Sequence, residues 1–165
     1  MGRGADAGRL WEVRTRAIRQ GCRDHYPAGI LERWASAPMP RAFSAHIRGH
    51  HYIVAESPGR VVGFAGFKRV TREVCAVFVA PEAMGTGVGA QMLKLLEEHA
   101  WRKGVGRIWL KASLNAVPFY EAAGWAAGKR SAHHSRTGIT IDCVCMHKRI
   151  GSASRKKSPT SRSRR

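Results

Sequence analysis

A glycine-rich turn at the start of a long helix constrains the fold of this chain more than any other feature of its sequence. The run 72–80 is β-branched and apolar and ends at Pro81, so it predicts a buried strand. Three glycines at alternate positions over 85–89 then lead into a helical pattern over 88–103. Glycines let a ligand approach the backbone, and the first amides of a helix attract negative charge. The segment therefore predicts a cradle for a phosphate or pyrophosphate.

Two well-known phosphate-binding loops fit this turn poorly. Residues 85–90 formally match a dinucleotide-binding fingerprint, but four residues separate the strand from the first glycine. The next predicted strand ends at 111–113 without the carboxylate that such a site uses. No Gly-Lys-Ser/Thr follows, which excludes a P-loop. A plain turn without a ligand is the remaining alternative, and three glycines at a helix start are costly for a plain turn.

Two segments carry a resemblance to a known family. Residues 77–90 resemble the acetyl-coenzyme A signature of the GNAT superfamily of N-acetyltransferases, a strand followed by Arg/Gln-x-x-Gly-x-Gly/Ala. Met84 stands where the family usually has Arg or Gln. Residues 115–125 resemble the family's Asn-x-x-Ala-x-x-Phe-Tyr-x-x-x-Gly-Phe helix, shorter by one residue before the Phe-Tyr pair. The resemblance covers about residues 50–148.

The pattern of elements agrees with the fold that this resemblance implies. Helical patterns fill the first quarter, and a brief helical or irregular link spans 41–49. Strands are predicted at 51–56, 61–70, 72–80, 107–112 and 139–147. We expect an α/β (α+β type) domain with a mixed, mostly antiparallel twisted sheet flanked by helices. Its first strand is expected to be truncated. The GNAT-like domain is predicted over 1–150, followed by a basic, disordered tail over 151–165.

The chain carries a large excess of positive charge, a formal net charge of +18 over 165 residues. Six basic residues and no acid lie in 151–165. This balance suits a polyphosphorylated coenzyme and disfavours strongly cationic acceptors such as polyamines. A small amine or a protein amine is the expected acceptor. The alternative is a nucleic-acid- or ribosome-associated binding module, acting through the tail and carrying a vestigial acetyl-CoA site.

The resemblance implies catalytic roles for two residues. Tyr120 matches the family's general acid, which protonates the departing thiolate; the alternative is a core tyrosine. Glu73 stands where some members carry a catalytic base, acting directly or through water on the attacking amine. The alternative is an ion-paired strand end, with Arg72 or Lys68 as partner. Glu56 and the two adjacent histidines His50 and His51 are rivals for the role of base.

The resemblance also implies a coenzyme site. The backbone of Val79 would meet the pantetheine arm and the thioester, and Asn115 would bind the coenzyme or cap a helix beginning at Val117. Acceptor contacts are expected from Tyr26 and Trp34, although aromatic residues at helical spacing are usually core. The predicted coenzyme-binding residues are Phe78, Val79, Met84, Gly85, Thr86, Gly87, Val88, Gly89, Ala90, Asn115, Phe119 and Tyr120.

The remaining expectations concern compartment, metals and assembly. The longest apolar run, 74–80, is far shorter than the ~20 residues of a membrane helix. The first ten residues lack the apolar core of a secretory signal. We therefore expect a soluble cytoplasmic protein without a membrane partner. The four cysteines form no Cys-x-x-Cys pair. The adjacent His133 and His134 have no third metal ligand near them in the sequence, so no metal is expected. A homodimer is left open.

Overall fold

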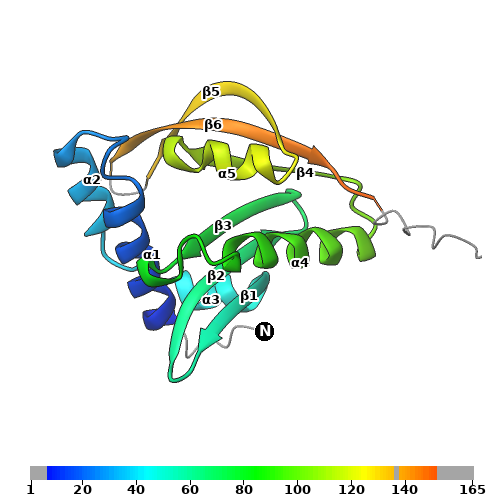
Figure 1. The fold of residues 1–165 in the computed structure, drawn as a ribbon, viewed down its shortest axis with the longest axis horizontal. Coiled ribbons are helices and arrows are strands. Elements are labelled where there is room, and N and C mark those ends of the chain that lie inside the picture. Colours follow the sequence, from blue (N-terminus) through cyan, green and yellow to red (C-terminus); the bar gives the residue numbers. More distant parts are fainter. Residues whose placement is uncertain (1–6, 136–137, 152–165) are drawn as a thin grey trace, which may run out of the picture.

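One twisted sheet of six strands organises the part of the chain that the structure, a computed structural model, describes: residues 7–135 and 138–151 (Figure 1). The predicted basic tail, from residue 152 onward, lies outside the described residues. In chain order the elements are α1 (Ala7–Gly21), α2 (Ala28–Ala35), α3 (Phe43–Gly49), β1 (His51–Ser57), β2 (Arg60–Lys68), β3 (Glu73–Val79), the 3₁₀ turn η2 (Pro81–Ala83), α4 (Val88–Arg102), β4 (Arg107–Ser113), the 3₁₀ turn η3 (Leu114–Ala116), α5 (Val117–Ala122), β5 (Ala126–His134) and β6 (Thr140–Arg149).

The sheet has the predicted mixed, mostly antiparallel character. Its strand order is β1-β2-β3-β4-β6-β5. Every neighbouring pair is antiparallel except β3 and β4, which are parallel. Within the described residues α1 precedes the first strand of the sheet, and the residues on which the expectation of a truncated first strand falls, 1–6, lie outside the described ranges.

The parallel pair β3 and β4 is joined at one point only. Glu73 is paired with Trp109, and the Trp109 amide donates a hydrogen bond to the Arg72 carbonyl at 3.1 Å. Beyond this point the two strands run apart (Figure 1). The sheet is thus divided into one half built from β1–β3 and a second half built from β4–β6, with an opening between them.

Helices cover both faces of the first half. Leu10 of α1 and Ile47 of α3 pack with Phe64 of β2 on one face. Leu93 of α4 packs with Phe67 on the other face. Because both faces are covered, β2 is buried along nearly its whole length, which explains its continuous apolar sequence.

A polar cluster ties α4 to the second half of the sheet. Glu97 of α4 and Lys148 of β6 form an ion pair at 2.7 Å, with side chains 15% and 22% exposed. The Trp125 indole donates to the same carboxylate at 3.0 Å, and Lys148 donates to the Ala123 carbonyl at 2.7 Å. Each charge therefore has several partners, which offsets the cost of removing it from water.

The turn between β2 and β3 contains the one non-glycine residue with positive φ among the described residues. Arg72 has φ 57° and donates its amide to the Arg69 carbonyl at 3.2 Å. Neighbouring Val70 is 96% exposed. This tight turn places Arg72 immediately before the single β3–β4 pairing.

One element was not anticipated, and another was left open. The link over 41–49, expected to be helical or irregular, contains the helix α3, and the preceding residue Ala42 provides no side-chain cap. The segment 126–134 had no strand prediction, and His133 and His134 were expected near a loop; the structure places both histidines in β5. This strand is largely exposed and contains no Val, Ile, Thr or aromatic residue, so it lacks the usual strand signal.

No helix in the described ranges has both the length and the apolar composition that crossing a membrane requires.

Two histidine rings stack where β1 meets α4. The rings of His51 and His99 are 3.5 Å apart and within 2° of parallel. Burial lowers the pKa of His51 to about 4, and the nearby His99, Arg102 and Lys103 act in the same direction. Both rings are therefore neutral at physiological pH, and protonating them opposes the packing of α4 on β1.

The His51 pKa predicts an acid-sensitive stability. The unfolded chain binds more protons than the folded one between about pH 4 and the ordinary value of 6.5. Stability present above pH 6.5 is lost as the pH falls through this window, by about 1 kcal/mol after solvent screening. In urea unfolding across pH 4–7.5, His51→Gln should flatten the profile, whereas the exposed-site control His25→Gln should leave it unchanged. Equal slopes in His51→Gln and the parent would contradict this origin of the acid sensitivity.

Candidate active site

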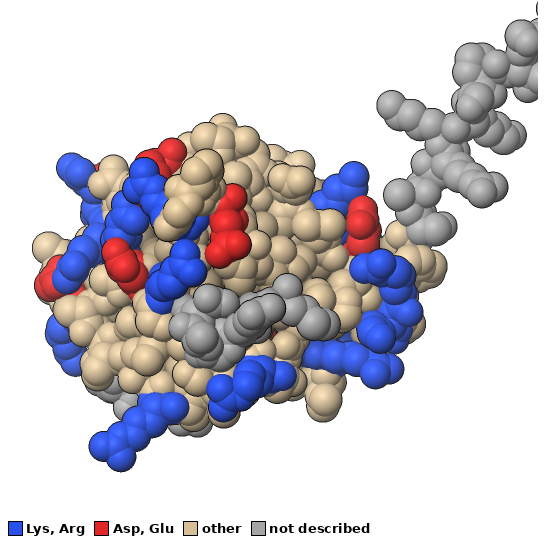
Figure 2. Space-filling model, turned by 90° about the horizontal axis from the view of Figure 1, so that it is seen from below, with Lys and Arg blue, Asp and Glu red and all other residues tan. Residues whose placement is uncertain are grey.

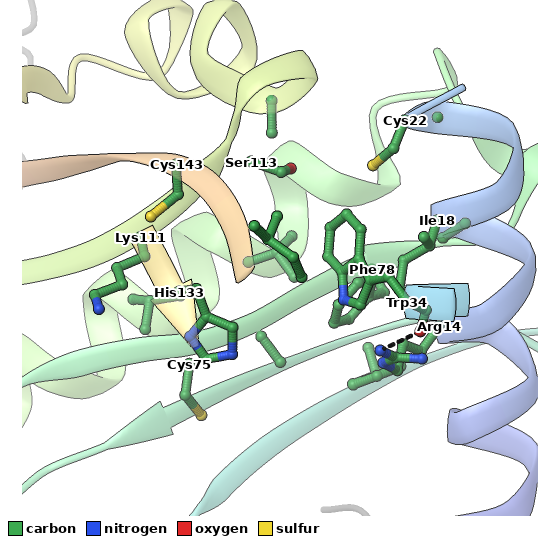
Figure 3. A pocket seen from close by; sticks show the side chains of 18 of the residues that line it. Arg14, Ile18, Cys22, Trp34, Cys75, Phe78, Lys111, Ser113, His133 and Cys143 are labelled. Carbon is green, nitrogen blue, oxygen red and sulfur yellow. Dashed lines mark hydrogen bonds between the residues drawn. The ribbon is translucent and has the colours of Figure 1, made fainter. Parts of the chain in front are cut away.

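The opening between β3 and β4 leads into a cavity of about 860 Å³ (Figure 3). Its lining comes from α1, the α2–α3 region, all six strands, α5 and the start of α4. In Figure 3, Arg14, Ile18 and Trp34 lie on one side of the space, and Lys111 and His133 lie on the other. Segments distant in sequence are thus brought to one site by the divergence of two strands.

The glycine-rich loop has the backbone shape that only glycine adopts readily. Gly85 has φ 76° and Gly87, the residue before α4, has φ 87°. A Cβ atom at either position would meet no protein atom within 4 Å, so this backbone faces open space. The Thr86 hydroxyl donates to the Ala83 carbonyl at 2.7 Å and steadies the turn. The first amides of α4 have no acceptor within the helix, which suits a pyrophosphate.

Gly89, the third glycine of the loop, allows three elements to pack closely. A Cβ atom at Gly89 would lie 3.3 Å from Val79 Cγ2 and 3.5 Å from the ring of Phe119. The absence of a side chain at Gly89 therefore lets α4 approach the end of β3 and the helix α5 closely. This approach closes one end of the cavity.

The predicted coenzyme residues fall into two groups. Those that line the cavity are Phe78, Val79, Met84, Gly89, Asn115, Phe119 and Tyr120. The other group forms the loop and first helical turn beside it, and consists of Gly85, Thr86, Gly87, Val88 and Ala90. The arrangement offers a slot, lined by Val79, Gly89 and Phe119, next to a row of amides in exposed residues. A long ligand with a phosphorylated end and a thin arm would match this shape.

Met84 and Asn115 lie against the end of α1. A Cβ atom at Gly21 would be 3.4 Å from Asn115 Nδ2 and 3.5 Å from Met84 Cε. The Asn115 side-chain oxygen accepts a hydrogen bond from the Cys22 thiol at 3.1 Å. The expectation that Asn115 caps α5 is wrong, because the residue before α5 is Ala116 and no side-chain cap is made.

Tyr120 lies in the cavity wall with its ring held by aromatic neighbours. Its ring is 5.0 Å from that of Phe119 and 5.7 Å from that of Trp125, both edge-to-face. Burial raises the pKa of Tyr120 well above its usual value of 10, so the phenol stays protonated at physiological pH. Among the described residues none hydrogen-bonds the Tyr120 hydroxyl, which leaves its proton available to a ligand.

Glu73 lines the same cavity, at the opposite end of β3 from Val79. Its carboxylate is 3.2 Å from Lys68 Nζ, and the two side chains are 21% and 29% exposed. Of the two ion-pair partners considered from the sequence, the structure selects Lys68. Of the rivals for the base, Glu56 is 63% exposed near Arg9, and His51 stacks on His99 of α4. The ring of His50 lies 4.4 Å from that of His46, a residue of the cavity wall.

Sequence reasoning missed a cluster between Glu73 and the coenzyme slot. Cys75 Sγ lies 3.8 Å from the Tyr52 hydroxyl and 4.0 Å from His46 Nε2. Burial lowers the pKa of His46, so its ring is neutral at physiological pH. Strand alternation from Glu73 could have indicated Cys75. His46 had no such signal, since it lies 29 residues before Cys75 in a segment whose position against the sheet the sequence does not indicate.

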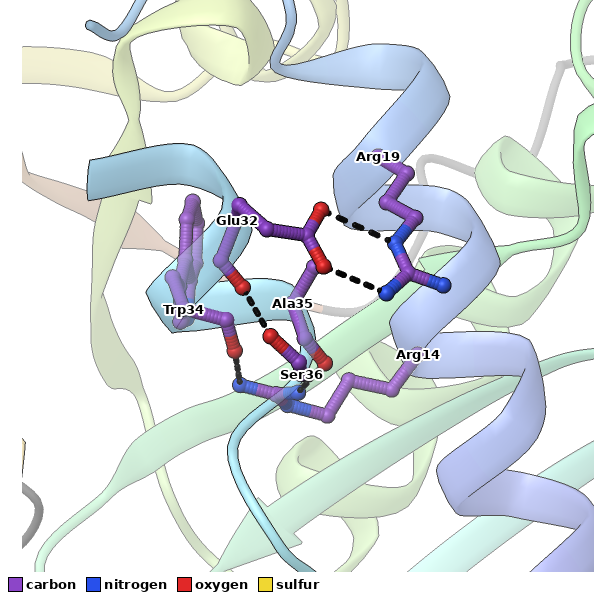
Figure 4. A network of polar contacts seen from close by, with 6 residues as sticks. All are labelled: Arg14, Arg19, Glu32, Trp34, Ala35 and Ser36. Carbon is purple, nitrogen blue, oxygen red and sulfur yellow. Dashed lines mark hydrogen bonds and ion pairs between the residues drawn. The ribbon is translucent and has the colours of Figure 1, made fainter. Parts of the chain in front are cut away.

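Of the two predicted acceptor residues, the structure brings only Trp34 to the cavity. A polar network fixes α2 against α1: Arg19 pairs with Glu32 at 2.7 Å, and Arg14 donates to the Trp34 carbonyl at 3.0 Å (Figure 4). Trp34 then lines the cavity.

Tyr26 is not among the lining residues. Its hydroxyl donates to the Asp142 carbonyl at 2.7 Å and accepts from the Leu114 amide at 2.8 Å. Tyr26 is buried, and both bonds join it to backbone of the second half of the sheet. This placement is that of a structural brace.

Comparisons with known proteins agree with this geometry. The family model of the acetyltransferase (GNAT) domain matches residues 20–149. The chain is 30% identical to the N-alpha-acetyltransferase RimI of Mycobacterium tuberculosis over 125 residues, 70% of this chain and 77% of that protein. A GCN5-related N-acetyltransferase from Rhodopseudomonas palustris has a TM-score of 0.82 at 28% identity, covering 88% of this chain and 91% of its own.

A third similar structure was solved with a bound donor. The acetyltransferase yncA of Salmonella typhimurium, in a structure that contains acetyl-CoA, has a TM-score of 0.61 at 18% identity, covering 97% of this chain and 95% of its own. At this identity the likeness concerns the fold.

The chain belongs to the GNAT family of acetyltransferases. It is therefore an enzyme that uses acetyl-CoA as the acetyl donor. The open glycine loop and the slot beside Gly89 fit this donor.

Substitution of a loop glycine tests the donor site. Gly87→Ala should lower the free energy of unfolding by about 1 kcal/mol, because alanine is strained at φ 87°. It should also reduce the thermal stabilisation by acetyl-CoA, since the new methyl group enters the space that the loop backbone faces. Differential scanning fluorimetry with and without acetyl-CoA measures both effects. Gly29→Ala in α2, where a Cβ atom also meets nothing within 4 Å, is the control and should retain the full acetyl-CoA shift.

Proposed function

We propose that this enzyme transfers the acetyl group of acetyl-CoA to the α-amine of a polypeptide N-terminus by direct attack. The observation that carries the proposal is that Tyr120 and Glu73 line one cavity, which is also lined by Gly89, the last glycine of the glycine-rich loop. The similarity to a named N-alpha-acetyltransferase supports an α-amine as acceptor. The compartment that fits this activity is the cytoplasm.

The chemistry assigns one proton transfer to each of these two residues. The amine nitrogen attacks the thioester carbonyl carbon, the carbon–sulfur bond breaks, and the thiolate leaves. The buried phenol of Tyr120 donates its proton to the departing sulfur. The proton released by the amine passes to Glu73. Because Glu73 lies six residues before Val79, about 20 Å along an extended strand, this transfer proceeds through water.

The free edge of β3 supports the placement of the donor arm. Within the described residues β3 pairs with β4 only at Glu73, so the backbone of the following residues is open toward the cavity. Buried backbone amides and carbonyls require partners. The amide groups of a pantetheine arm, lying along Phe78 and Val79, would provide them.

Removing the Tyr120 hydroxyl tests the acid. Tyr120→Phe should reduce kcat about 100-fold, because the thiolate then leaves without a proton donor. The thermal shift produced by acetyl-CoA should stay near that of the parent, since the ring remains in the wall. The parent should show no loss of kcat/KM from Tyr120 ionisation up to pH 10, given its raised pKa. An unchanged kcat in Tyr120→Phe would overturn the assignment.

A second pair of variants tests the base. Glu73→Gln should reduce kcat/KM, because an amide accepts no proton. His46→Gln is the matched control from the same cavity: it should leave kcat/KM near that of the parent. If His46→Gln loses activity and Glu73→Gln retains it, the neutral His46 is the base and the proposal for Glu73 fails.

A further inference from the structure

A basic groove adjoins the active-site cavity on the second half of the sheet. It has a volume of about 570 Å³, and its lining includes Arg72, Arg107, Trp109, Lys129, Cys145 and His147. Neither Asp nor Glu occurs among its described lining residues. The mechanism proposed above makes no use of this surface.

The cations of this groove have no acidic partner among the described residues, a property that they share with some cations elsewhere, such as Arg102 and Arg130. Three of the arginines outside the groove are paired with carboxylates: Arg16 and Arg60 with Glu82, and Arg19 with Glu32. On the face shown in Figure 2, acidic side chains lie beside basic ones.

In contrast, Arg72, Arg107 and Lys129 are exposed and make no ion pair with the described acids. Lys111, which lines the cavity, is likewise exposed without an acidic partner among the described residues; its ammonium group approaches the Ala132 carbonyl at 3.5 Å. Four cations thus remain uncompensated along one surface.

The strand register places the groove and the cavity along one row of β4 residues. Lys111 lies opposite Cys145, and Trp109 lies opposite His147, two residues further along. Alternate residues of a strand share a face, so Arg107, Trp109 and Lys111 form one row on β4. This row runs about 13 Å away from the cavity, a length that four residues of an extended peptide would cover.

We propose that this groove binds acidic side chains of the acceptor polypeptide, downstream of the N-terminal amine that enters the cavity. The inference rests on the proposed N-terminal acetylation and adds the substrate class: polypeptides with Asp or Glu within about the first ten residues. The uncompensated cations attract such a segment and repel a basic one, and the continuous row sets its direction.

A nucleic acid fits the groove less well. Surfaces that bind single strands combine positive charge with several exposed aromatic rings on which bases stack. Besides the imidazole of His147, Trp109 is the one aromatic ring of this groove among the described residues, and both rings are half-buried. The Trp109 indole donates to the Thr71 carbonyl at 2.7 Å, which holds the ring against the β2–β3 turn.

The test compares peptides that differ only in charge. Three peptides share the same first three residues and carry acidic, neutral or basic side chains at positions 4–8. At low ionic strength kcat/KM should be about tenfold higher for the acidic than for the basic peptide, and the difference should shrink as salt screens exposed charges. Lys129→Glu and Arg107→Glu should each lower kcat/KM for the acidic peptide several-fold and leave the neutral peptide unaffected.

Arg130→Glu is the matched control. It makes the same charge change on the neighbouring residue of β5, which does not line the groove, and should preserve the preference. Acetylation of all three peptides at equal rates would overturn the inference and leave the proposed function intact. Acetylation of none, with a normal acetyl-CoA shift, would overturn the proposed function itself. Salt-dependent binding of a single-stranded oligonucleotide that Lys129→Glu abolishes, without any peptide preference, would assign the groove to nucleic acid and overturn the proposal.

Discussion

The geometry of the whole site depends on the pairing of β3 with β4 at a single position. Their single pairing, between Glu73 and Trp109, is enough to keep one sheet, yet it leaves the following backbone of β3 open. Parallel neighbours in a continuous sheet would have filled this edge with their own hydrogen bonds. The cavity, the open backbone beside Val79 and the position of α5 all follow from that separation. The Glu97–Lys148 pair holds α4 and β6 together across it.

The divergence also separates the donor and acceptor functions. The donor side is built from local sequence: the end of β3, the glycine loop and the start of α4 follow one another in the chain. The acceptor side is assembled from α1 to α3 on one flank and from β4 to β6 on the other. Contacts such as Arg14 with the Trp34 carbonyl fix the first flank. Changes in acceptor preference are therefore accessible without disturbing the donor site.

This difference explains what the sequence could predict. The glycine loop and the Phe119–Tyr120 helix are short-range patterns, so they could carry the family resemblance that implied the fold and the candidate donor residues. His46 could not be found in this way, because its helix lacks a capping signal and its partner Cys75 is 29 residues away. The composition establishes the net positive charge, but it does not indicate where the cations gather on the surface of the folded domain. The basic groove exists only because β4, β5, β6 and the β2–β3 turn meet in space.

Arg72, which lines the basic groove, has a backbone conformation that is unfavourable for a residue with a side chain. It contributes a cation to the groove from a left-handed conformation, φ 57°, in which a side chain is less stable than glycine by about 1 kcal/mol. The same residue provides the carbonyl that accepts the backbone hydrogen bond from Trp109 of β4. A glycine would relax the turn and remove the charge. Arg72 therefore lowers the local stability of the turn beside the single β3–β4 pairing, while it keeps a positive charge at the surface.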